Sequence, residues 1–173
     1  IRLPINQIHQ NIMLVKVFSI ATHGVDAQTI DVEVNSGGEI PAGKLGYFLV
    51  GLPDNAVKEG YMRIEAAAKN SGMKLPRIRM TVNLAPADIR KEGAAYDLPI
   101  AIGMLAATGF IRKDLLDKYI ILGELSLDGA IRPIKGALPI AIQARKEGFK
   151  GFILPAENAR EAAIVDNLEV FAA

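Results

Sequence analysis

The sequence predicts one domain of the α+β or α/β class, in which a mixed sheet packs on helices. Strand-like runs dominate the first part of the chain, and later strand-like runs alternate with stretches of helical periodicity. The chain has 173 residues, which suits a single domain that buries about 70% of its unfolded surface. We therefore expect a hydrophobic core large enough to hold the fold without disulfides or a structural metal.

Four strands are predicted in the first half. Residues 13–20 and 29–35 carry β-branched and aromatic side chains in partial alternation, and the turn at 23–26 separates them. Residues 47–52 predict a third strand, and residues 79–84 predict a fourth whose alternate side chains face the core. We expect the early strands to pair as a meander.

Two helices are predicted among these strands. Asp54 is suited to accept hydrogen bonds from the free amides of a first helical turn, and Gly72 fits just beyond the last turn. Residues 98–108 are small and almost wholly apolar, which predicts a helix buried on most sides. The apolar face of the first helix recurs at helical spacing through Val57, Tyr61, Ile64 and Ala68.

The last third of the chain predicts a strand at 119–125 and a hairpin, for which Asp128-Gly129 favours a two-residue loop. A helix follows at 136–147 and ends at Gly148. The remaining predicted elements are a buried strand at 151–154, a helix at 157–165 and a strand at 168–171.

Composition excludes several classes of protein. The net charge is +1, so bulk electrostatics do not indicate a nucleic-acid binder. The absence of cysteine excludes disulfides and thiolate metal sites. Asp97 and Arg112 bracket the longest apolar run, which is too short to span a membrane. We expect a cytoplasmic protein that does not enter the membrane.

Residues 1–12 have no clear period, whereas Met13 opens a strand-like run. We expect residues 1–12 to be either an appended tag or a flexible natural arm, and residues 13–173 to form the domain. Gly38 to Lys44 matches most of a phosphate-binding loop, but Leu45 replaces the hydroxyl residue that holds magnesium. This loop is therefore interpreted as a connection between strands.

The chain offers little for catalysis. Its serines are Ser19, Ser36, Ser71 and Ser126, and none lies in a Gly-x-Ser-x-Gly turn. His23 is the single histidine of the expected domain, and carboxylates such as Asp88 and Glu92 show no metal-ligand spacing. We therefore predict no catalytic residue, no metal site and no cofactor for these residues.

The segment 83–93 is the most unusual. It leaves a strand with Arg90 and Lys91 adjacent, and one interpretation is a loop that contacts an anion or a partner. The alternative is a solvated connector in which Asp88 and Glu92 neutralise these cations. Arg132 and Lys135, after the hairpin, would join the same basic patch if the two loops meet.

Six segments carry a family resemblance that extends over residues 13–173. The segments are Met13 to Lys16, Val50 to Glu59, Val82 to Gly93, Tyr96 to Ala101, Gly123 to Pro133 and Leu154 to Asn158. They resemble the N-terminal domain of magnesium-chelatase-like proteins of the competence protein ComM (YifB) group. The resemblance implies a Lon-protease-like domain with the ribosomal-protein-S5-domain-2 type of fold.

The same resemblance implies a bacterial cytoplasmic protein that acts on DNA during recombination of incoming strands in transformation. The family joins this domain to an AAA+ ATPase module, which is absent from the 173 residues. ATP, Mg²⁺ and assembly into a hexamer are expected through that module.

The more distant resemblance to active Lon domains implies a lost catalytic site. Alignment of the helix after the Lon serine places Asp97 at the serine position, and alignment of the turn before the Lon lysine places Leu138 at the lysine position. Leucine cannot exchange a proton, and a carboxylate lacks an activating partner. We expect Asp97 to cap the helix that begins at Leu98.

These observations favour a non-catalytic accessory domain of a DNA-remodelling ATPase, with Arg90, Lys91, Arg132 and Lys135 as candidate DNA contacts. One alternative is a hydrolase or peptidase with an unconventional site built on Asp97 or Lys135. A further alternative is a purely structural oligomerisation module.

Overall fold

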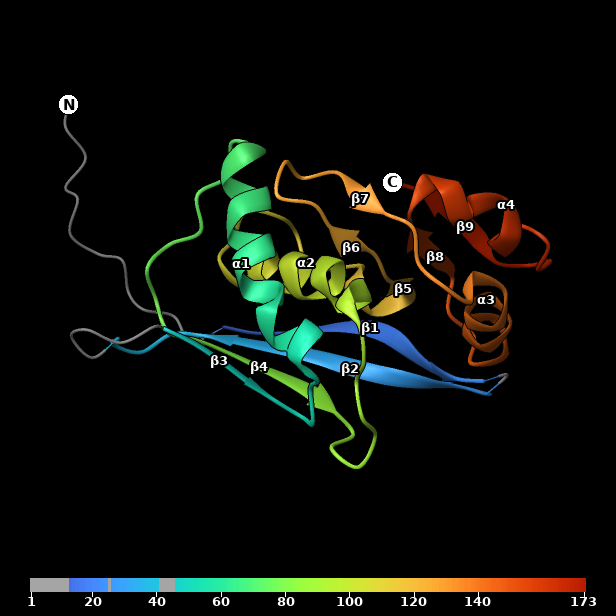
Figure 1. Ribbon diagram of the computed structural model, residues 1–173, viewed down its shortest axis with the longest axis horizontal. Coiled ribbons are helices and arrows are strands. Elements are labelled where there is room, and N and C mark those ends of the chain that lie inside the picture. Colours follow the sequence, from blue (N-terminus) through green and yellow to red (C-terminus); the bar gives the residue numbers. More distant parts are fainter. Residues whose placement is uncertain (1–12, 25, 41–45) are drawn as a thin grey trace.

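The fold is a seven-stranded mixed sheet with helices on both faces, seen in a computed structural model that describes residues 13–24, 26–40 and 46–173 (Figure 1). The predicted class is confirmed. The strands of this sheet, in spatial order, are β3 (Tyr47–Val50), β4 (Met80–Ala85), β2 (Asp26–Ser36), β1 (Met13–His23), β5 (Tyr119–Ile121), β8 (Gly151–Leu154) and β9 (Glu169–Ala172). The predictions for residues 1–12 and for Lys44-Leu45 lie outside the described residues.

The early strands do not form the expected meander. β1 and β2 form a long antiparallel hairpin and β2 pairs antiparallel with β4, but β3 pairs parallel with β4 at the edge of the sheet. The reason is helix α1 (Asn55–Asn70), which follows β3 and carries the chain back over the sheet. A parallel neighbour needs such a crossover, and β4 therefore enters between β3 and β2.

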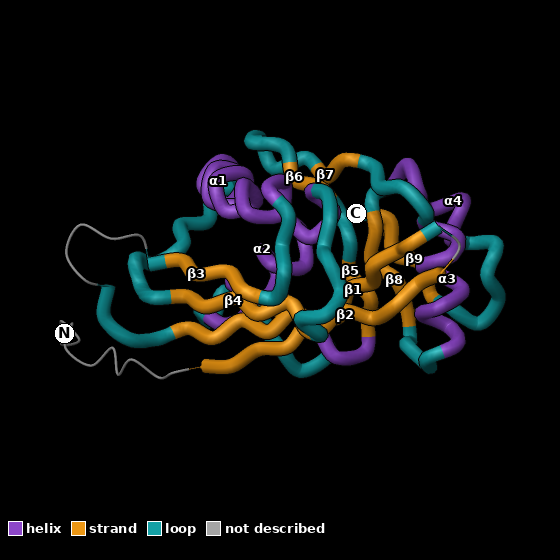
Figure 2. Tube along the Cα trace, turned by 60° about the horizontal axis from the view of Figure 1, so that its bottom comes forward, coloured by secondary structure: helices purple, strands orange, loops and turns teal. Residues whose placement is uncertain are grey.

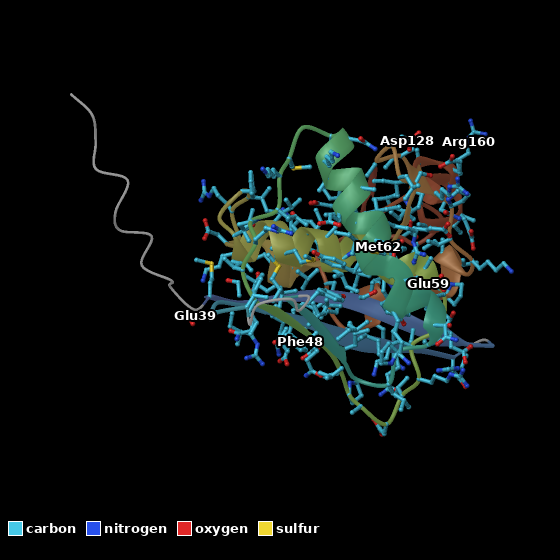
Figure 3. The ribbon with its side chains drawn as sticks, turned by 60° about the vertical axis from the view of Figure 1, so that its left-hand side comes forward. Glu39, Phe48, Glu59, Met62, Asp128 and Arg160 are labelled. Carbon is cyan, nitrogen blue, oxygen red and sulfur yellow. The ribbon has the colours of Figure 1, made fainter. Side chains whose placement is uncertain are left out.

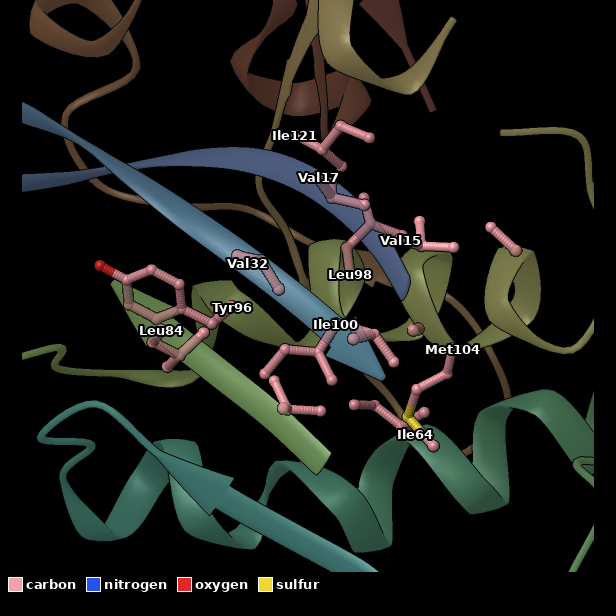
Figure 4. Close-up of a cluster of buried hydrophobic side chains, with 14 of the residues drawn as sticks. Val15, Val17, Val32, Ile64, Leu84, Tyr96, Leu98, Ile100, Met104 and Ile121 are labelled. Atoms are coloured by element: carbon pink, nitrogen blue, oxygen red, sulfur yellow. The ribbon is translucent and has the colours of Figure 1, made fainter. Parts of the chain in front are cut away.

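Helices α1 and α2 (Asp97–Ala107) cover one face of the β3–β4–β2–β1 half of the sheet (Figures 1 and 2). The main core lies beneath them and includes Val15, Val17, Ile64 and Met104 (Figure 4). The predicted periodicity is confirmed, because Val57 and Ile64 are buried on α1 and almost every residue of α2 is buried. On the other side of this half, the exposed Phe48 points away from α1 (Figure 3).

Helix α3 (Ala137–Lys146) packs on the opposite face, over β2, β1 and β8, with the short helix α4 (Ala159–Ala162) beside it. Their core includes Ile20, Ile140 and Phe152. In β1, Val17 and Ala21 face the first core while Ile20 faces the second, because successive side chains of a strand point to opposite faces.

The predicted strand at 119–125 is wrong as one element. The chain breaks after β5, and β6 (Glu124–Leu125) pairs with β7 (Ile131–Arg132) in a separate hairpin. Gly123 causes the break: its N–H donates to Ala95 O at 2.9 Å, and its carbonyl accepts from Leu98 N at 3.0 Å. A Cβ atom at Gly123 would lie 2.7 Å from Ile131 Cγ2, so the close approach requires glycine.

The hairpin between β6 and β7 has a three-residue loop and not the predicted two-residue loop. Ser126 N donates to Ala130 O at 2.9 Å, which leaves Leu127, Asp128 and Gly129 between them. Gly129 has φ +93°, the left-handed conformation that completes such a loop. The tip, with Asp128, lies beside the C-terminal end of α1 (Figure 3), where Asn70 Nδ2 donates to Leu127 O at 2.6 Å.

The remaining predicted elements are present with shifted bounds. The helix expected at 157–165 is divided into a 3-10 turn, η3 (Ala156–Asn158), and α4. Two further 3-10 turns, η1 (Ala94–Tyr96) and η2 (Leu116–Lys118), precede α2 and β5. No helix in the described part of the chain is both long enough and apolar enough to cross a membrane.

Candidate functional site

The carboxylate of Asp97, at the first position of α2, accepts hydrogen bonds from α1 and β6. Arg63 Nε lies 2.6 Å from Asp97 Oδ2 and Arg63 Nη2 lies 3.0 Å from Oδ1, which is a bidentate ion pair. Leu125 N donates to Oδ2 at 3.2 Å. The expectation that Asp97 caps its helix is wrong, because Arg63 and Leu125 engage the carboxylate and the N-cap is Tyr96, without a side-chain hydrogen bond.

This ion pair is largely removed from solvent. The Asp97 side chain is 1% exposed and that of Arg63 is 20% exposed. Burial raises the pKa of Asp97 above its ordinary value, and the Arg63 guanidinium only partly opposes this effect. A Cβ atom at Gly60 would lie 2.6 Å from Asp97 Oδ1, so the absence of a side chain at Gly60 makes room for the carboxylate.

Leu138, which the sequence predicts to align with the Lon lysine, lies in the first turn of α3. Its side chain packs against the second core, and its backbone N–H donates to Glu161 Oε1 at 2.9 Å. An apolar side chain here has no proton to exchange, and Asp97 is occupied by Arg63. These surroundings agree with the predicted loss of a Lon-type catalytic pair, which stays a prediction.

A cavity of about 350 Å³ lies at the carboxyl ends of the parallel strands β1 and β5. The chain continues from β1 into the antiparallel β2 on one side of the cavity and from β5 toward β8 on the other. Its buried lining comes from Ile20, Tyr96, Leu122 and Ile140, and its charged side chains are Arg90, Glu92, Glu124 and Lys135, with the exposed His23.

The two basic loops that the sequence singled out meet at this cavity, because Arg90 and Lys135 both line it. The Arg90 side chain is 65% exposed and forms an ion pair with Glu92, with 3.1 Å between Nε and Oε1. That ion pair was expected if the loop is a solvated connector in which Glu92 neutralises Arg90. DNA contact by these cations stays a prediction.

Lys91 is separated from the other cations. Its side chain is fully buried, and its ammonium donates to the carbonyl of Pro86. Burial lowers the pKa of Lys91, and the charge of Asp88 opposes this effect. In an extended segment, side chains alternate, so Arg90 and Glu92 face outward while Lys91 points inward. A surface contact through Lys91 is not available in this conformation.

Arg132 lies at the end of β7 and is exposed, but it does not line the cavity. Its Nε donates to Ser126 Oγ across the hairpin. It therefore extends the basic surface beyond the cavity on the hairpin side.

Sequence reasoning missed the partners that organise this region. Nothing in the sequence marks Arg63 as the partner of Asp97, because the two are 34 positions apart and meet only when α1 packs on α2. Asn158 was also missed. It is a buried polar residue at the end of η3, the turn that follows β8. No cluster of three or more metal-ligating side chains occurs within the described residues.

Comparisons with known proteins give the family. Residues 32–158 match the family model described as subunit ChlI of Mg-chelatase. The chain is 41% identical over 155 residues to competence protein ComM of Haemophilus influenzae, which covers 90% of the chain and 30% of ComM. It is 43% identical over 150 residues to the YifB protein of Escherichia coli, which covers 87% of the chain and 29% of YifB.

A weaker similarity leads to Lon protease 2 of Bacillus subtilis, which is 31% identical over 107 residues and covers 60% of the chain and 18% of that protease. The chain thus spans less than a third of the length of these relatives. The resemblance to magnesium-chelatase-like proteins is confirmed. With its matched segment running from β2 to η3, the chain belongs to the family of subunit ChlI of Mg-chelatase.

Proposed function

We propose that this domain is a non-catalytic, Lon-like accessory module of a magnesium-chelatase-like ATPase that acts on DNA. The observation that carries the first part is the environment of Asp97. At the position aligned with a Lon serine, the carboxylate is 1% exposed and held by Arg63 and Leu125. A group fixed in this way joins elements of the fold and does not attack a substrate.

The relatives support the second part. One of them is named a competence protein, and it matches 90% of this chain. Because the chain covers only 30% of that protein, an ATPase module, its ATP and Mg²⁺, and a hexameric ring belong to this proposal as properties of the longer protein. The protein would act in the cytoplasm, where its DNA substrate is found.

The exposed cations give the proposed DNA contact a location. Arg90 and Lys135 lie at one cavity, and Arg132 extends the surface along the hairpin. With a net charge of only +1, the chain has no general attraction for phosphates, so binding would depend on this local group. Lys91 is not part of it, because it is buried.

The test is fluorescence anisotropy of labelled single- and double-stranded 40-mers with the chain at 20 to 200 mM salt. We expect binding at low salt that weakens as salt rises, and a shallower salt dependence in a triple variant, Arg90→Ala, Arg132→Ala and Lys135→Ala. The matched control removes three exposed cations elsewhere: Arg112→Ala, Lys113→Ala and Lys118→Ala.

Absence of binding at the lowest salt would refute the DNA contact. So would an equal loss of affinity in the triple variant and its control, because binding would then follow net charge and not this surface. The non-catalytic part is tested separately by turnover of fluorogenic peptides. Activity that disappears in Asp97→Asn would overturn it.

A further inference from the structure

Both walls of the cavity at the ends of β1 and β5 are fixed by part-buried hydrogen bonds. On one wall, Asn158 is 8% exposed, and its side chain accepts from Ile134 N at 2.8 Å and donates to Ile134 O at 3.0 Å. Ile134 directly precedes Lys135. The backbone that carries the Lys135 side chain is therefore held in one position.

The opposite wall is fixed in the same way. Asp54 Oδ2 accepts from Gly93 N at 3.0 Å, and Asp54 N donates to Lys91 O at 2.9 Å. The buried Lys91 attaches the segment to Pro86. The cavity is therefore formed before any ligand arrives, as is usual for small-molecule sites.

The charges around the cavity leave one cation without a partner. Arg90 is paired with Glu92, and Glu124 lies near enough to Arg63 to raise the pKa of that guanidinium. Within the described residues, Lys135 forms no ion pair. A single negative charge would satisfy Lys135, whereas Glu92 and Glu124 would repel a dianion.

The lining adds a second requirement, since the partly exposed Ala94, Ala95 and Ile134 present apolar surface to the cavity. A ligand that fills about 350 Å³ must cover this surface with apolar atoms to gain from burial. Inorganic phosphate lacks such atoms.

From these walls, charges and surfaces, we propose that the cavity binds a carboxylate carried on a short apolar group, with the carboxylate at Lys135 and the apolar group against Ala94, Ala95 and Ile134. Two sources share this chemistry: the C-terminus of a peptide with an apolar last residue, and a free short-chain organic acid. This inference goes beyond the proposed role on DNA.

The test is an NMR titration of the ¹⁵N-labelled chain with four probes: N-acetyl-alanyl-leucine, its C-terminal amide, 4-methylpentanoate and inorganic phosphate. We expect saturable shifts of the Gly93, Ala95 and Lys135 amides with at least one of the two carboxylates. The amide and phosphate should cause no saturable shift. The stronger carboxylate identifies the source as a peptide C-terminus or a free acid.

Two variants locate the site. Lys135→Gln should weaken binding by about tenfold, because a charge-assisted hydrogen bond is lost. The matched control, Lys146→Gln at the other end of α3, should bind like the parent chain. Ala94→Leu places a larger side chain in the lining and should abolish binding, with the spectrum itself reporting that the fold is kept.

The proposal is overturned if neither carboxylate binds, if the amide or phosphate binds as well, or if Lys135→Gln binds like the control. Arg132→Ala separates the two proposals, because Arg132 does not line the cavity. It should weaken DNA binding and leave the affinity for the carboxylate unchanged.

Discussion

Arg63 on α1 holds Asp97 on α2 through two hydrogen bonds of 2.6 and 3.0 Å, and the same carboxylate accepts the N–H of Leu125 on β6. One buried carboxylate thus joins three elements that are far apart in the sequence. Its position, at the start of the apolar helix, is the one that the sequence predicts to align with a Lon serine. In this chain the position contributes to the architecture.

Removal of the guanidinium is expected to destabilise the fold strongly. Arg63→Ala leaves the Asp97 carboxylate buried with no opposite charge, and such a loss costs about 3–5 kcal/mol of unfolding free energy. Urea unfolding followed by circular dichroism measures it. Arg112→Ala is the control, because its pair with Asp114 is exposed and should cost at most about 1 kcal/mol. Similar losses in both variants would contradict the structural role of Arg63.

Lys91 is expected to make stability depend on pH. Burial lowers its pKa below the ordinary 10.5, so between the lowered value and 10.5 the unfolded chain binds more protons than the folded chain. The unfolding free energy of the parent chain should therefore rise with pH in this window, relative to Lys91→Met, which has no titratable group. Urea unfolding at several values between pH 7 and 10 gives the difference.

A difference between the two chains that stays constant or falls as pH rises would contradict this account of Lys91. Lys91→Met also tests whether Lys91 holds the loop in place or contacts DNA. Because Lys91 is buried, Lys91→Met should leave DNA affinity unchanged, whereas Arg90→Ala should reduce it.

The fold was largely predictable because its elements carry local signals. Alternation in the early strands, the Asp54 cap and the apolar run of α2 each depend on neighbouring residues. The errors arose where distant segments decide the outcome. Gly123 ends a strand because Ala95 and Leu98 take its backbone groups, and β4 enters beside β3 because α1 carries the chain over the sheet.

The site was predictable only in part, for the same reason. Adjacent cations marked Arg90 and Lys91 together, but residue type does not tell which of two neighbours points outward. The pairing of that loop with the segment before α1 buries Lys91 and exposes Arg90. Asp97 resembled a helix cap because its true partner, Arg63, is distant in the sequence.

Asp54 is expected to connect helix stability to the geometry of the cavity. Its carboxylate caps α1 through Val57 N at 2.8 Å and holds Gly93 N at 3.0 Å. Asp54→Ala should cost about 1–2 kcal/mol, and hydrogen exchange at the Gly93 amide should become faster. Asp54→Ser restores the cap with a shorter side chain. It should recover most of the stability, and unchanged exchange at Gly93 in Asp54→Ala would disprove the connection.

Gly60→Ala is expected to lower the unfolding free energy when Asp97 is present and to raise it when Asp97 is replaced by alanine. In a helix interior, Gly→Ala ordinarily stabilises by about 1 kcal/mol. Here the new Cβ atom would lie 2.6 Å from Asp97 Oδ1, so we expect Gly60→Ala to destabilise by about 1–3 kcal/mol. In an Asp97→Ala background the clash is gone, and the same substitution should stabilise. A double-mutant cycle by urea unfolding measures this coupling, with Glu59→Ala as the neighbouring surface control. Additive free energies would show that Gly60 does not make room for the carboxylate.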